Sequence, residues 1–61
     1  MLIGYIIERN WNDAKLYWAG RHWHPRHAQR YATRENAARA LGRLRDVPGA
    51  INIVVAYQIR L

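Results

Sequence analysis

Alternating apolar positions predict three β-strands in this chain. Residues 2–9 place Ile3, Tyr5 and Ile7 on one face of a first strand, and residues 14–19 supply a second strand. The turn-rich residues 10–13 separate the two strands and predict a hairpin with a four-residue loop. The clearest alternation begins at residue 50 and repeats through Ile51, Ile53, Val55, Tyr57 and Ile59. We expect this last strand to be central or well covered.

The hairpin loop also predicts a register between the first two strands. Apolar partners would share one face, while a Glu–Lys pair would lie on the other. The expected pairs are Ile7 with Leu16, Tyr5 with Trp18, Ile6 with Tyr17, and Glu8 with Lys15.

A helix is predicted from about Arg34 to Asp46. Thr33 is a good N-cap, because its hydroxyl can accept from a free amide of the first turn, and Glu35 suits the positive end of the helix dipole. Residues 47–49, Val-Pro-Gly, would stop the helix. Its apolar stripe consists of Ala37, Leu41 and Leu44, widened by Ala38 and Ala40.

These elements predict one small α+β domain over residues 1–61, in which a three-stranded antiparallel sheet packs on one helix in the order ββαβ. Residues 20–32 form a long connector, with a short strand expected near residues 27–31. One helix covers only one face of the sheet. The other face is unusually apolar, which favours a homodimer or a partner protein. Its expected members are Leu2, Gly4, Ile6, Tyr17, Ala19, Val54 and Ala56.

Composition narrows the functional classes. A domain of 61 residues buries only about 60% of the surface that its unfolded chain exposes, so its stability is marginal. The absence of cysteine excludes disulfides and thiolate chemistry and favours a reducing, cytoplasmic setting. The apolar start of the chain has no preceding basic residue and is followed directly by an acid, so we expect neither a signal peptide nor a membrane span.

The charge balance predicts an anionic partner. Ten Lys and Arg residues face four Asp and Glu residues, which leaves a formal net charge of +6. Nucleic acid, a nucleoprotein complex or an acidic protein surface would satisfy that charge.

Residues 21–30, RHWHPRHAQR, contain no acid, and we call them the basic segment. Arginines continue from it into the helix N-terminus, which itself favours phosphate. On the helix, by contrast, Glu35 precedes Arg39 by four residues and Asp46 follows Arg43 by three, so we expect these charges to compensate one another. The candidate anion-binding residues are Arg21, Arg26, Arg30 and Arg34, with Trp11 and Tyr17 as aromatic contacts.

Three histidines raise two further possibilities. His22, His24 and His27 could meet as metal ligands, but no cysteine or nearby carboxylate completes the set and the neighbouring arginines repel a divalent cation. They could also act with Arg26 or Arg30 in a ribonuclease-like acid–base scheme. So small a domain has little surrounding structure to position catalytic imidazoles. We therefore expect no metal site, no cofactor and no enzymatic activity.

The order of the elements and the pattern A-x-x-Y-x-T-x-x-x-A, formed by Ala28, Tyr31, Thr33 and Ala37, resemble small ββαβ proteins of bacteriophages and bacterial genomes. Some of those proteins are anti-CRISPR or other anti-defence proteins. The chain is similar, more weakly, to the arm-site DNA-binding domain of tyrosine integrases. That second resemblance implies a DNA-contacting sheet face, here with Lys15 and Tyr17.

Together these features predict a non-enzymatic basic binding module, of phage or mobile-element type, that engages nucleic acid or a nucleic-acid-containing complex. The alternative is a protein-directed inhibitor of a bacterial defence complex, which would use the apolar sheet face and arginines on an acidic protein surface.

Overall fold

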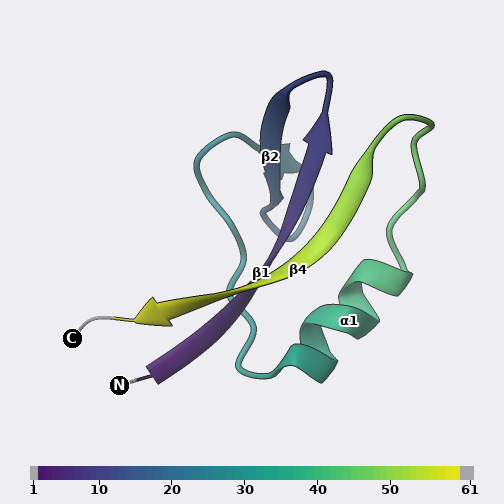
Figure 1. Ribbon diagram of the computed structural model, residues 1–61. Helices are drawn as coiled ribbons and strands as arrows, with labels where there is room; N and C mark the ends of the chain where they lie inside the picture. Colours follow the sequence, from purple (N-terminus) through teal and green to yellow (C-terminus); the bar gives the residue numbers. More distant parts are fainter. Residues whose placement is uncertain (1, 60–61) are drawn as a thin grey trace.

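The computed structural model describes residues 2–59, with side chains for residues 3–58. This part of the chain forms a four-stranded antiparallel sheet with one helix, which confirms the α+β class (Figure 1). The strand order is β3-β2-β1-β4, so the last strand lies beside the first, as predicted. The elements are β1 (Leu2–Trp11), β2 (Ala14–Trp18), β3 (Trp23–His24), α1 (Arg34–Gly42) and β4 (Ile51–Ile59).

The β1–β2 hairpin closes through a two-residue turn. Trp11 lies opposite Ala14, and the intervening Asn12 and Asp13 have φ angles of 49° and 63°. Asn and Asp tolerate this left-handed conformation, and two such residues in succession match the right-handed twist of the flanking strands. The predicted four-residue loop is therefore wrong, because β1 continues to Trp11.

The tighter turn shifts the pairing of β1 with β2 by two residues. Arg9 lies opposite Leu16 and Glu8 opposite Tyr17, so the predicted pairing of Ile7 with Leu16 and the other three predicted pairs are wrong. A shift of two residues returns each side chain to the same face of the sheet. The predicted division of β1 and β2 into two faces therefore holds.

The faces of β4 are the reverse of those predicted. Val54 lies opposite Ile7 and Ala56 opposite Tyr5, on the face that α1 covers, so their predicted place on the outer face is wrong. The strand is also at the edge of the sheet and is not central. We call the face without the helix the open face. From β4 it carries Ile51, Ile53, Val55 and Tyr57.

Helix α1 begins as predicted and ends early. The Thr33 hydroxyl accepts a hydrogen bond from the amide of Asn36 at 3.1 Å. The helix ends at Gly42, four residues before the predicted end at Asp46. Beyond it the backbone tightens into i to i+3 hydrogen bonds, and the chain turns so that the carbonyl of Arg45 accepts from the Arg9 side chain at 3.0 Å.

The connector differs from the prediction in detail. A strand was expected near residues 27–31, but the structure places β3 at Trp23–His24 and a single antiparallel bridge between Tyr31 and Tyr5. That bridge uses two backbone hydrogen bonds, of 3.0 and 2.8 Å, and extends the sheet beside β1 where β2 has ended. Tyr31 therefore occupies a strand position beside β1.

The core is very small. Among the described side chains, Ile7 and Ala37 are the buried apolar residues, both at 0% exposure, and Arg9 is buried at 7%. Ala37 has a small side chain, which allows α1 to pack closely over β1 and β4.

No helix in the described part is long and apolar enough to cross a lipid bilayer. The side chains of Leu2 and Ile59, and all of Arg60, lie outside the described residues, so the predicted outer-face position of Leu2 is not described.

With so little buried surface, loss of one core side chain should unfold much of the population. We expect Ile7→Ala to lower the free energy of unfolding by about 2–5 kcal/mol, measured by urea titration with tryptophan fluorescence. The matched variant Ile51→Ala truncates a side chain that is 64% exposed and should change it by about 0.5 kcal/mol or less. Equal losses in the two variants would show that the open face is buried in solution.

Candidate nucleic-acid interface

Strand β3 distributes the basic segment over both faces of the sheet. Trp23 lies opposite Trp18 and His24 opposite Tyr17. The Trp23 ring lies edge-on to the Trp18 ring, with centroids 5.5 Å apart, and the Arg9 guanidinium lies 3.9 Å from the Trp23 ring centroid. Trp23 therefore belongs to the helix side. Because successive side chains of a strand alternate, His24 lies on the open face.

His24 holds the turn that follows it. Its Nδ1 atom accepts hydrogen bonds from the backbone amides of Arg26 and His27, each at 3.0 Å. The His27 ring lies 4.6 Å from the His24 ring, and the His22 ring 6.0 Å from it. The three imidazoles thus meet, as the sequence allowed. Within the described residues, however, no group of three His, Cys, Asp or Glu side chains is arranged to hold a metal ion.

The environment of His24 favours its neutral form. Desolvation lowers the pKa of His24, and repulsion from His27, His22 and Arg26 lowers it further. The two amide donors act in the same direction, because Nδ1 can accept them only while it carries no proton. A neutral His24 is therefore part of the structure of the basic segment.

A shallow depression of about 340 Å³ lies on the open face, next to this turn. The Arg30 guanidinium lies 5.7 Å from the ring centroid of Tyr57, within the range of a cation–π contact. Tyr57 lies across Gly4, where an added Cβ would come within 2.5 Å of the phenol oxygen, so only glycine fits there. The lining residues, none of them acidic, are Ile6, Arg26, His27, Ala28, Arg30 and Tyr57.

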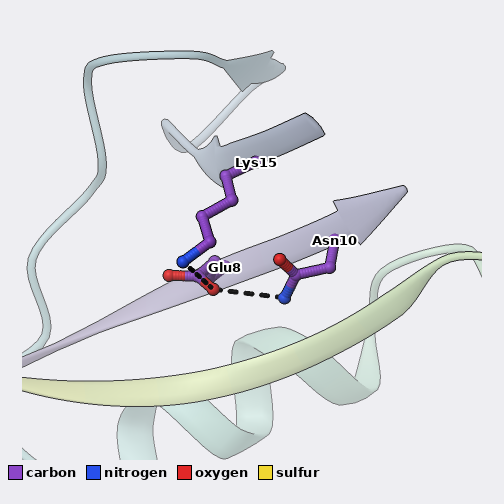
Figure 2. A network of polar contacts seen from close by, with 3 residues as sticks. All are labelled: Glu8, Asn10 and Lys15. Atoms are coloured by element: carbon purple, nitrogen blue, oxygen red, sulfur yellow. Dashed lines mark hydrogen bonds and ion pairs between the residues drawn. The ribbon is translucent and has the colours of Figure 1, made fainter. Parts of the chain in front are cut away.

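The acid on the open face is already neutralised. Figure 2 shows Glu8 between Lys15 and Asn10: the lysine Nζ lies 3.9 Å from Glu8 Oε1, and the Asn10 side-chain amide donates to the same oxygen at 3.1 Å. The predicted attraction between Glu8 and Lys15 is thus confirmed, although the two residues are not direct cross-strand partners. Tyr17, opposite Glu8, is half-buried beside this pair.

The arginines on and just after α1 form fewer ion pairs with acidic side chains than the sequence predicts. Among residues 2–59 the structure has one ion pair, between Lys15 and Glu8. The expected compensation of Arg39 by Glu35, and of Arg43 by Asp46, is therefore wrong at the level of direct contacts. The helix ends before Asp46, so the spacing that favoured the second pair does not apply.

Five predicted site residues do not line the depression. Lys15 and Tyr17 lie on β2 at the open face, and the other three lie elsewhere. Arg34 is on the helix side, with its guanidinium 5.2 Å from the ring centroid of Tyr5. Trp11 is at the hairpin end, close to Gly49. Arg21 is exposed in the turn between β2 and β3.

The structure therefore brings some predicted residues together and adds one. Arg26, Arg30, Lys15 and Tyr17 share the open face. The added residue is Tyr57 of β4, which lines the depression. A signal for it was present, because a glycine inside a strand indicates close approach by a neighbouring group, and Gly4 has Tyr57 as its partner.

Comparison of the chain with protein-family models, with curated proteins and with solved structures found no match. The assignment of function therefore depends on the geometry of the chain itself.

The lowered pKa of His24 predicts that stability depends on pH. The unfolded chain binds this proton more tightly than the folded chain, so the contribution of His24 is fully present above pH 6.5 and is lost as the pH falls below that value. We expect the free energy of unfolding to decrease between pH 6.5 and about pH 5, measured by urea titration. His24→Asn should remove this dependence, because the amide oxygen can replace Nδ1 as the acceptor and does not titrate. An unchanged pH profile in that variant would assign the effect to other groups.

Proposed function

We propose that this protein is a non-enzymatic binding module that contacts nucleic acid through the open face, next to the basic segment. The observation that supports this proposal best is the depression that Arg26, Arg30 and Tyr57 line together, with Arg30 over the Tyr57 ring and no acid among the lining residues. Arginine forms bidentate hydrogen bonds to phosphate oxygens, and an aromatic or apolar floor suits the sugar and base surfaces beside them.

Charge on the rest of this face favours the same partner. The Lys15 side chain is 64% exposed, while the Glu8 side chain that it faces is only 12% exposed, and the Glu8 carboxylate also accepts a hydrogen bond from Asn10. The lysine therefore presents its charge to solvent more than the acid does. Exposed cations around a neutralised acid give a positive field over the face, and such a field attracts a polyanion.

The geometry of the histidines favours binding over catalysis. His24 Nδ1 is occupied by two backbone amides, which leaves that ring only Nε2 for acid–base work. A general base and a general acid need two imidazoles held on opposite sides of a reacting phosphate. Here His27 lies against His24, at 4.6 Å between ring centroids, with no space for a phosphate between the rings.

A second candidate function is binding to a protein with an acidic surface around an apolar centre. Ile51 and Ile53 on the open face of β4 are 64% and 41% exposed, which is more than a solvated sheet face requires. Together with the arginines, they would suit the protein-directed alternative that the sequence offers.

Duplex DNA of mixed sequence is the first test of the proposed function. We expect the Arg26→Gln/Arg30→Gln double variant to bind at least about tenfold more weakly than the unmodified protein in gel shifts near physiological salt. In a plot of the logarithm of the binding constant against the logarithm of the salt concentration, the slope of this variant should be less steep by about 0.9 for each phosphate contact that is removed.

The charge-matched control is Arg39→Gln/Arg43→Gln, which removes the same charge from the helix. It should bind the duplex within about a factor of two of the unmodified protein. Equal weakening in both double variants would show that only net charge matters. Binding that disappears at physiological salt for every form would exclude the nucleic-acid proposal and favour the protein partner. RNA that remains intact after incubation is expected, and its cleavage would contradict the non-enzymatic assignment.

A further inference from the structure

A second concavity lies on the opposite face of the sheet, between α1 and β2. It is a groove of about 540 Å³, within the usual size range of small-molecule sites. The groove exists because α1 has only nine residues and packs over β1 and β4, which leaves the β2 side of the sheet uncovered. We call it the helix-side groove. Its lining residues are Trp18, Gly20, Gln29, Tyr31, Asn36, Arg39, Ala40, Arg43 and Leu44.

Two aromatic rings line the sheet side of the groove. Trp18 and Tyr31 are both half-buried, and burial raises the pKa of Tyr31, so its phenol stays neutral. The backbone places them together, because the amide of Gln29 donates to the carbonyl of Trp18 at 2.8 Å and thereby anchors the chain two residues before Tyr31. Aromatic side chains in such a position offer stacking surfaces to a planar ring.

Two arginines line the helix side. Arg39 and Arg43 are four residues apart, so they lie on the same face of the helix. Both are exposed, and within residues 3–58 neither has a carboxylate within ion-pair distance. No acid lines the groove. The charge of these two guanidinium groups is therefore left for an anion from outside.

The remaining polar groups are side-chain amides. Gln29 lies against Gly20, where an added Cβ would come within 2.5 Å of its Oε1 atom, so the glycine provides the space for this side chain. Asn36 is on the first turn of α1, and its backbone amide is already held by Thr33. Side-chain amides carry both donors and acceptors, as the edges of nucleobases do.

We propose that the helix-side groove binds a single nucleotide unit, with the base against Trp18 and Tyr31 and the phosphate at Arg39 and Arg43. This site goes beyond the proposed function, since it lies on the other face of the sheet and uses different arginines. The unit can come from a free nucleotide or from an unpaired nucleotide of a single strand. A base inside a duplex is stacked on both faces and paired along one edge, so duplex DNA cannot fill the groove.

The test is a titration of the full chain with adenosine 5′-monophosphate, followed by two-dimensional NMR of the amide and indole N–H groups. We expect the indole signal of Trp18 and the side-chain amide signals of Gln29 and Asn36 to shift together. Arg39→Gln/Arg43→Gln should weaken binding about tenfold or more. Arg26→Gln/Arg30→Gln, with the same loss of charge, should leave it within about a factor of two.

Further ligands distinguish a free nucleotide from a single strand as the source of the bound unit, and distinguish both from non-specific phosphate binding. A short single-stranded oligonucleotide that binds with the same dependence on Arg39 and Arg43, while the monophosphate does not, would identify the strand as the source. Inorganic phosphate that reproduces the shifts at similar concentration would overturn the proposal, and so would equal weakening in the two double variants. Loss of duplex binding in Arg26→Gln/Arg30→Gln reports on the open face alone. The proposed function and the nucleotide site in the helix-side groove can therefore succeed or fail separately.

Discussion

A buried arginine with no carboxylate partner among the described residues determines how this small domain is assembled. Arg9 on β1 donates from Nε to Asn52 Oδ1 on β4 at 2.8 Å and from Nη2 to the carbonyl of Arg45 at 3.0 Å, and it stacks on Trp23 of β3 at 3.9 Å. It thus joins two neighbouring strands, the loop after α1 and the far edge of the sheet. A buried cation is costly unless its donors are satisfied. These contacts therefore specify one arrangement, which a core of Ile7 and Ala37 alone could not do.

The position of the basic segment follows from that contact. Because Trp23 turns toward Arg9, its neighbour His24 must face the other way. Nδ1 of His24 then holds the amides of Arg26 and His27, and the chain returns to the sheet through the bridge between Tyr31 and Tyr5. Arg30, one residue before that bridge, consequently lies over Tyr57 on the open face. The interaction that closes one side of the sheet thus positions the charged groups on the other side.

Local signals in the sequence predicted the elements, whereas contacts between distant residues determined the faces. The Thr33 cap, the existence of the hairpin and the approximate positions of β1, β2 and β4 follow from neighbouring residues, and the structure confirms them. The alternation along β4 predicts that its odd-numbered residues face the core, because they are the more apolar set. The structure reverses this assignment, since Arg9 needs Asn52 beside it and Gly4 accommodates Tyr57. The predicted compensation of Arg43 by Asp46 fails because spacing along a helix does not show where the helix ends. Glu35 and Arg39 make no ion pair although both lie on α1.

Because this domain is thin and has a small core, ligand binding at its surfaces affects its stability strongly. One helix covers part of one face, so the aromatic rings and arginines lie at concavities on both sides of a single sheet. A ligand that binds only the folded chain stabilises the fold by an amount that grows with the ratio of its concentration to its Kd. In a large domain that stabilisation is a minor correction, but here only two apolar side chains among the described residues are buried, and the cations repel one another at a formal charge of +6. An anion on either face removes part of that repulsion and holds the connector against the sheet, so binding and folding of this chain are coupled through the same arginines.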